Sequence, residues 1–266
     1  MAANCAMNNP ENSAEAPGLG EIGEDRLLGG RLCLLQPVKG HRAGSDAVLL
    51  AAAIPELDAG PLADFGAGVG TVGLAVALRQ PGLEVVLVER DPELAALAAR
   101  NAGLNNLGGR VRVAVGTIGE RNSDLAREGL AVASMAWVAM NPPFFEASEV
   151  RASPVANRRA AHVAGQSLDD WLKTARHLLK PGGGVSIIHR AEALGAILTG
   201  LETGFGAIEI RPIHGQAERP AIRVIVSGRL GSKKPAALLP ALVLNGADGR
   251  FSAFSEALHR GEAVLA

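Results

Sequence analysis

Cysteine, tyrosine and long apolar runs are scarce in this sequence, and each scarcity excludes a class of protein. The 266 residues include two cysteines, Cys5 and Cys33, too few for a disulfide framework or a cysteine zinc site. Tyrosine is absent, and six phenylalanines and two tryptophans cannot build a broad platform for stacking single-stranded bases. The longest apolar runs, 47–54 and 130–140, are too short to span a bilayer. No basic segment followed by an apolar stretch opens the chain, so we expect a cytoplasmic protein.

Charge is divided unevenly along the chain. Residues 1–25 hold five acidic residues and no lysine or arginine, so 26 basic residues face 22 acidic ones in the remainder. The first 25 residues are rich in Asn, Ala, Glu, Pro and Gly and have no helical or strand period, which predicts a disordered acidic tail. The mildly basic body excludes a histone-like coat of polyanions but permits a nucleic acid partner.

From residue 62 onward, apolar strands alternate with helices. Strands are predicted at 62–65, 84–89, 111–115, 131–140 and 185–189, and helices at 71–80, 92–103, 168–179 and 191–203. Strands that are apolar on both faces indicate a parallel sheet covered by helices on both sides. Two further β-rich runs, 205–213 and 221–229, are predicted to form a hairpin.

The predicted fold is therefore a Rossmann-like, doubly wound α/β domain with a mostly parallel sheet and a C-terminal antiparallel hairpin. Residues 26–266 are expected to form this single domain, with 26–60 as a small N-terminal addition and 61–266 as the Rossmann-like core. In the addition we expect a strand at 31–35 and a helix over 47–54, capped by Ser45 or Asp46.

A glycine-rich segment, residues 66–70 (GAGVG), stands where the first core strand turns into its helix. Glycines let the backbone turn tightly and approach a ligand closely. Glu89 ends the next strand, where a carboxylate can accept hydrogen bonds from ribose hydroxyls. The spacing is not G-x-G-x-x-G, and Asp64 just before the loop disfavours a pyrophosphate but suits a cationic sulfonium or an amino group. The combination predicts S-adenosylmethionine rather than NAD.

The sequence Asn141-Pro142-Pro143-Phe144 follows the fourth core strand. Two prolines stiffen the turn because they fix φ and remove two donors. The Asn141 side chain and the Pro142 carbonyl offer a pair of acceptors for both hydrogens of an –NH2 group, which aims its lone pair at a methyl group. Phe144 offers a face for stacking a flat substrate. Geometry then supplies most of the catalysis without a strong general base.

These motifs resemble those of class I S-adenosylmethionine-dependent methyltransferases with the NPPF/NPPY motif. More narrowly, the chain is similar to the bacterial family that makes N6-methyladenosine beside the anticodon of a valine tRNA. The narrower resemblance is carried by GHRAGSDAVLLAAAI (40–54), NPPFF (141–145) and the tail over 218–257, and it covers roughly residues 30 to 260.

The resemblance implies roles for particular residues. The cofactor would be bound by Asp46, Asp64, Gly66, Ala67, Gly68, Gly70, Glu89, Arg90, Thr117 and Asn141, and the target base by Asn141, Pro142, Pro143 and Phe144. Thr117 stands where such enzymes often place an acid near the adenine ring. Substrate RNA would meet Arg158, Arg159, Arg223 and Arg229. The six histidines show no metal spacing, so no metal is expected, and the tryptophans are expected in the core.

Three other functions fit the same residues. A glutamine amide in a protein has the same two-hydrogen geometry as adenine N6, and guanine N2 of ribosomal RNA is a further amino target. From a different class, the chain could be an RNA-binding or chaperone factor on a degenerate methyltransferase fold. The intact glycine loop, Glu89 and Asn141 argue against that third function.

Overall fold

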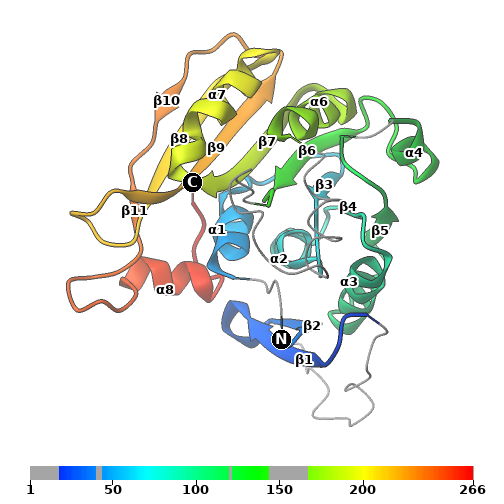
Figure 1. The fold of residues 1–266 in the computed structure, drawn as a ribbon, viewed down its shortest axis with the longest axis horizontal. Coiled ribbons are helices and arrows are strands. Elements are labelled where there is room, and N and C mark those ends of the chain that lie inside the picture. Colours follow the sequence, from blue (N-terminus) through cyan, green and yellow to red (C-terminus); the bar gives the residue numbers. More distant parts are fainter. Residues whose placement is uncertain (1–17, 40–43, 120–121, 144–166, 266) are drawn as a thin grey trace, which may run out of the picture.

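A computed structural model describes residues 18–39, 44–119, 122–143 and 167–265. Figure 1 shows a central twisted sheet with helices on both faces. The strand order is β10–β8–β9–β7–β6–β3–β4–β5, with β11 paired to β8. This arrangement confirms the predicted Rossmann-like doubly wound fold.

The middle of the sheet is parallel. It consists of β3 (Leu62–Phe65), β4 (Val85–Glu89), β5 (Val111–Val115), β6 (Met135–Met140) and β7 (Leu179–Arg190). Pairing is parallel from β7 through β6, β3 and β4 to β5. These strands are apolar on both faces because helices cover each side.

The antiparallel part of the sheet lies beyond β7. The predicted hairpin is confirmed as β8 (Phe205–His214) and β9 (Ala221–Leu230), with β9 antiparallel to β7. Two short strands, β10 (Ala237–Leu238) and β11 (Leu242–Val243), add to β8 in parallel. The hairpin therefore extends the sheet on the side away from β4 and β5.

Two apolar clusters hold the helices to the sheet. On one face lie α1 (Ser45–Ala53), α2 (Thr71–Arg79), α3 (Pro92–Leu104) and, against α1, α8 (Ala253–His259). On the other face lie α4 (Asn122–Arg127), α6 (Leu168–Leu178), the 3-10 turn Ala191–Ala193 and α7 (Leu194–Glu202). Fully buried Leu50, Leu74 and Leu87 represent the first cluster, and Leu172 and Ile197 represent the second.

Helix starts agree with the sequence in two cases and differ in one. The predicted helices at 92–103 and 168–179 begin where expected: the Asp91 side chain caps the first by accepting from the Glu93 N–H, and Ser167 and Asp170 form a capping box at the second. In α1, however, the N-cap is Gly44, with no side-chain capping bond. The expected cap from Ser45 or Asp46 is wrong because both residues lie inside the first turn, where their side chains take other partners.

The strand β7 begins earlier than the glycine-rich sequence suggested. Leu179 pairs with Met135, and a register shift then leads to the pairing of Gly184 with Trp137. The intervening Lys180 and Pro181 are exposed at this irregularity, where a proline without an N–H does not interrupt the ladder. The predicted helix end and the predicted strand are therefore adjacent without a separate loop.

The N-terminal segment is more ordered than predicted. Residues 22–25 belong to β1 (Ile22–Leu27), which continues through the 3-10 turn Leu28–Gly30 into β2 (Leu32–Pro37) as an antiparallel hairpin. The predicted disorder over 1–25 is thus wrong for 22–25, because buried Ile22 anchors the strand and Asp25 accepts a hydrogen bond from the buried Gln36 side chain, while Glu24 is exposed. Residues 1–17 lie outside the described residues.

Two further features of the described chain bear on the sequence expectations. Cys33 is buried in β2, and the other cysteine, Cys5, lies outside the described residues. No helix in the described part of the chain combines the length and the apolar character needed to cross a membrane.

Candidate active site

The sheet register places the predicted motifs side by side at one edge. Phe65 pairs with Met140 on β6 and with Val88 on β4, and Glu89 pairs with Val115 on β5. Gly66 follows Phe65 at the end of β3, and Asn141 follows Met140 at the end of β6. Both residues therefore lie at the edge of the sheet where Glu89 ends β4. In a doubly wound sheet, ligands bind outside the carboxyl ends of the strands.

The three glycines of the loop are needed for different structural reasons. Each has a positive φ, of 66° at Gly66, 56° at Gly68 and 91° at Gly70, a region that L side chains rarely adopt. A Cβ at Gly66 would lie 2.6 Å from Trp171 Cη2, and one at Gly70 would lie 2.8 Å from Leu87 Cδ1. A Cβ at Gly68 would meet nothing within 4 Å. Gly66 and Gly70 thus allow close packing, and Gly68 faces open space where a ligand can approach.

Glu89 is held by the backbone around it. Its Oε2 accepts from Gly68 N at 2.7 Å, and its Oε1 accepts from Arg90 N and Asp91 N, both at 2.9 Å. The side chain is 7% exposed. Because a carboxylate has about four lone-pair sites, three bonds leave capacity for a ribose hydroxyl. Arg90 itself is exposed next to this carboxylate.

Asp64 lies beneath the loop and is 2% exposed. Its Oδ2 accepts from Gly73 N at 2.9 Å, in the first turn of α2. Burial raises the pKa of Asp64 to about 7; the Gly73 N–H opposes this shift, and the charge of Glu89 adds to it. The hydrogen bond between Gly73 and Asp64 fixes the junction between the glycine loop and α2. Ala67 belongs to this loop.

The Asn-Pro-Pro turn leaves β6 next to the glycine loop. Asn141 is partly exposed, Pro142 is buried and Pro143 is exposed. Phe144, Arg158 and Arg159 lie outside the described residues. Trp171 of α6, expected in the core, is 7% exposed and meets the Phe65 ring edge-on at 6.4 Å between centroids. This tryptophan therefore also covers Gly66, a role that its apolar helix position gave no signal for.

Two residues with different predicted roles form an ion pair. Arg223 Nε donates to Asp46 Oδ2 at 2.8 Å, with the side chains 27% and 23% exposed. The pair lies at the carboxyl edge because Arg223 of β9 pairs with Arg190, the last residue of β7. The predicted cofactor residue and the predicted RNA residue thus stand together, 177 positions apart in sequence.

His189 neighbours this ion pair near the end of β7. Burial lowers its pKa; the Arg190 N–H donated to Nδ1 opposes the shift, and the charges of Arg190 and Arg223 lower the pKa further.

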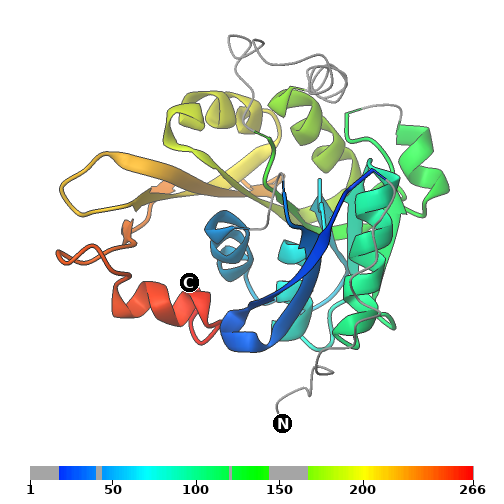
Figure 2. The same ribbon diagram turned by 60° about the horizontal axis from the view of Figure 1, so that its bottom comes forward.

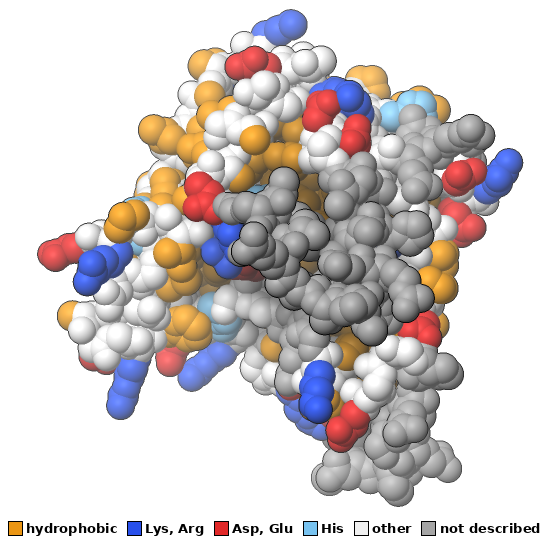
Figure 3. All heavy atoms as spheres, in the orientation of Figure 1, with side chains coloured by type: hydrophobic (Ala, Val, Ile, Leu, Met, Phe, Trp, Pro, Cys, Tyr) orange, Lys and Arg blue, Asp and Glu red, His pale blue; other side chains and the backbone are white. Residues whose placement is uncertain are grey.

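Arg229 lies elsewhere. It pairs with Gly184 at the amino-terminal part of β7, and its guanidinium stands 4.3 Å from the centre of the Trp137 ring. Arg223 and Arg229 therefore do not share one surface. On the face seen in Figure 3, the described lysines and arginines are dispersed around the outline rather than gathered in one patch.

Thr117 follows β5 on the other side of Glu89. It is partly buried, and Gly116 N before it donates to the Glu89 carbonyl at 2.9 Å. This places Thr117 at the same edge as Glu89.

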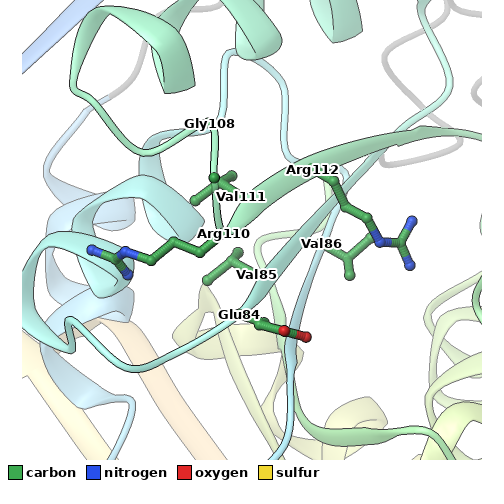
Figure 4. A pocket seen from close by; sticks show the side chains of 8 residues that line it. Glu84, Val85, Val86, Gly108, Arg110, Val111 and Arg112 are labelled. Atoms are coloured by element: carbon green, nitrogen blue, oxygen red, sulfur yellow. The ribbon is translucent and has the colours of Figure 1, made fainter.

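A hollow at the opposite edge of the sheet does not belong to this constellation. It holds about 190 Å³ and is lined by Glu84, Val85, Val86, Gly108, Gly109, Arg110, Val111 and Arg112 (Figure 4). Ligand pockets typically span roughly 300–1,000 Å³, and this hollow lies at the amino ends of β4 and β5. In the described ranges, no group of three or more His, Cys, Asp or Glu could hold a metal ion.

Comparison with known proteins agrees with this geometry. The profile of the methyltransferase small domain family matches residues 42–211, more than half of the chain. A tRNA1(Val) (adenine(37)-N6)-methyltransferase from Aeromonas hydrophila is 28% identical over 216 residues, which cover 79% of this chain and 85% of the relative. A release factor glutamine methyltransferase from Salmonella typhimurium is 29% identical over 177 residues, 59% of this chain and 56% of the relative.

A solved structure has the same fold over most of the chain. It is described as a predicted O-methyltransferase from Agrobacterium tumefaciens, and it superposes with a TM-score of 0.69 at 28% identity. The superposition covers 83% of this chain and 98% of that one.

The carboxyl edge fits the methyl donor of such enzymes. Gly68 leaves open space, and Glu89 keeps acceptor capacity for a ribose. The chain therefore belongs to the methyltransferase small domain family, and it is a methyltransferase that uses S-adenosylmethionine.

Proposed function

We propose that this enzyme methylates N6 of an adenine in tRNA near the anticodon. The observation that carries the proposal is the place of Asn141-Pro142-Pro143 on β6, directly beside the glycine loop of β3. An amino group held there faces the edge at which Gly68 and Glu89 stand. Relatives named as tRNA adenine-N6 methyltransferases support this substrate, and two of them align with 79% and 82% of the chain.

The residues of this chain hold and aim the amino group. The Asn141 side-chain oxygen and the Pro142 carbonyl accept its two hydrogens, which draws the nitrogen lone pair out of conjugation with the ring and aims it at the methyl group. Bound S-adenosylmethionine supplies an electrophilic methyl group. Held in this way, the nitrogen would form a bond to that methyl group as the sulfur leaves as a neutral thioether, and the nitrogen would then lose one proton to solvent. Because holding and aiming the amino group needs no strong general base, positioning is the main contribution of the protein.

The same placement assigns proposed roles to one aromatic residue and three arginines around the base. Phe144, outside the described residues, is proposed to stack on the flipped adenine. Arg158 and Arg159, also outside them, and Arg223 are proposed to meet RNA phosphates. A tRNA substrate also implies that the enzyme works in the cytoplasm.

A protein glutamine is the second candidate substrate. The relative named as a release factor glutamine methyltransferase favours it, because a glutamine amide presents the same pair of hydrogens to Asn141. That alignment covers 59% of this chain, a smaller share than the 79% and 82% that two of the tRNA-modifying relatives reach. We therefore place RNA first.

The deciding experiment is transfer of labelled methyl from S-adenosylmethionine to small RNA from a strain lacking this gene, followed by digestion to nucleosides. Label in N6-methyladenosine is the expected result, and the Asn141→Ala enzyme run in parallel should give none. Label in another nucleoside would replace adenine N6 as the target. Absence of label, with cofactor binding intact and label appearing in a protein, would overturn the RNA proposal in favour of glutamine.

A further inference from the structure

A buried asparagine joins the glycine loop to the N-terminal hairpin. Asn101 of α3 is 0% exposed. Its Oδ1 accepts from Leu35 N at 2.7 Å, while its Nδ2 donates to the carbonyls of Leu35 and Val69, each at 3.0 Å. One side chain thus bonds to the backbone of β2 and to the backbone of the loop beside the cofactor.

The Val69 side chain contacts the hairpin and, like its carbonyl, it also contacts α3. Val69 is 7% exposed and belongs to a separate apolar cluster with Ile22 of β1, Leu35 of β2 and Leu97 of α3. Figure 2 shows the β1–β2 hairpin, in dark blue, lying across the molecule beside α3. The hairpin and α3 therefore pack around Val69, which has the largest side chain of the glycine loop.

Fixing Val69 also fixes its glycine neighbours. The Val69 carbonyl and the Gly70 N–H belong to one planar peptide, so the bond to Asn101 sets the direction of both. Gly70 N in turn donates to the Ala67 carbonyl at 2.8 Å, which closes the turn around Gly68. Gly68 N is the donor to Glu89 at 2.7 Å. The contact from Asn101 is transmitted in this way to the groups that border the cofactor.

We propose that Asn101 is a positioning residue for S-adenosylmethionine. Through the Val69 carbonyl and the β1–β2 hairpin it maintains the loop conformation in which Gly68 and Glu89 bind the cofactor. The N-terminal hairpin is accordingly part of the cofactor site's support and not an independent appendage.

The chain contains a matched control one turn further along α3. Asn105 Oδ1 accepts from Cys33 N at 2.9 Å, and its Nδ2 donates to Cys33 O at 2.6 Å and to Asn101 O at 2.8 Å. Asn105 therefore grips β2 through the same pair of backbone bonds, but its third bond goes to its own helix instead of the glycine loop.

The experiment compares Asn101→Ala with Asn105→Ala by calorimetric titration with S-adenosylmethionine, at a temperature where both variants are folded. Removing the partner of a buried acceptor should raise the dissociation constant of Asn101→Ala about tenfold. Asn105→Ala should stay within about twofold of the parent, although both variants lose melting temperature. Equal affinity losses in the two variants, or an unchanged affinity in Asn101→Ala, would overturn the proposal.

A second variant keeps the test decisive if Asn101→Ala does not fold. Val69→Ala retains the polar bonds of Asn101 and removes the apolar grip of the hairpin on the loop. Its dissociation constant for S-adenosylmethionine should rise about threefold or more, since packing against Val69 restrains the same peptide. A parental affinity in folded Val69→Ala would contradict the proposed support.

Discussion

The two edges of the sheet use their polar side chains for different purposes. At the carboxyl edge, Glu89 and Asn141 stand beside a glycine loop in which Gly68 faces open space. At the amino edge, Arg110 donates to carbonyls of the α2 end and the loop after it, and Arg112 donates to the carbonyls of Glu128 and Gly129. Charged side chains at the amino edge thus satisfy backbone carbonyls that helices and loops leave unpaired. The comparison teaches that one edge leaves room for a ligand while the other completes the backbone hydrogen bonding of the fold.

The sharpest test of the carboxyl edge is Asn141→Ala. Because Asn141 is proposed to aim the substrate amine, kcat should fall roughly 10²–10³-fold, while cofactor affinity stays within about twofold. Single-turnover methyl transfer and calorimetry measure the two quantities separately. Asn141→Asp, which retains an acceptor oxygen, should keep more activity than the alanine variant. Weakened cofactor binding with normal turnover at saturation would contradict the assigned role.

The pH dependence of stability tests the carboxyl group beneath the loop. The pKa of Asp64 is raised from 3.8 to about 7 in the folded protein, so the folded state binds this proton more tightly than the unfolded state. The resulting stabilisation is fully present below pH 3.8 and is lost as the pH rises through about 7. Its size is at most about 4 kcal/mol.

Denaturant melts of the parent and Asp64→Asn from pH 5 to 8 check this expectation. The parent should lose more stability over that interval than the variant, whose amide does not titrate. Identical slopes for the two proteins would show that Asp64 does not titrate in this window.

Glu89 and Glu84 provide a matched pair near opposite ends of β4. Glu89→Gln replaces a carboxylate that accepts three backbone N–H bonds by a group with one acceptor oxygen. The dissociation constant for S-adenosylmethionine should rise about tenfold. Glu84→Gln, at the amino edge, should stay within about twofold. Calorimetric titration of both variants gives the comparison, which fails if the two affinities change equally.

The smallest expected effects distinguish two arginines of β9. Arg223→Ala should lower the slope of log K for RNA against log salt by about one, because it removes the phosphate contact proposed for Arg223 at the carboxyl edge. Arg229→Ala should leave that slope unchanged and lower stability by about 0.5–1 kcal/mol, through loss of the contact with Trp137. Filter binding across salt concentrations and thermal melts measure these effects. A changed slope in Arg229→Ala would place RNA at the amino edge as well.

Much of the fold could be predicted because its signals are local. The apolar strands, the capping box at Ser167 and the turn chemistry of the glycine loop each occupy a few consecutive residues. Parallel pairing then brings Gly66, Glu89 and Asn141 to one edge by rule. This part of the candidate site follows from the sequence with no knowledge of distances.

The remaining contacts could not be predicted because they join distant segments. The pair Asp46–Arg223 and the bonds from Asn101 to Leu35 and Val69 depend on how α1, α3 and the hairpins pack. The strand β1 carries acidic residues that resemble a solvated tail until β2 is beside it. Arg223 and Arg229 likewise belong to one basic segment of the sequence. They lie at opposite edges of the sheet because they stand near opposite ends of β9.

The position of β6 divides the sheet into two portions. On one side lie β3, β4 and β5, whose ends contact the loop and Glu89; on the other lie β7 and the antiparallel hairpin. The hairpin also contacts elements outside its own portion, because Arg223 pairs with Asp46 of α1 and Arg229 stands over the Trp137 ring of β6. A substitution of Arg223 would therefore also release Asp46, so the two portions cannot be altered independently at this point.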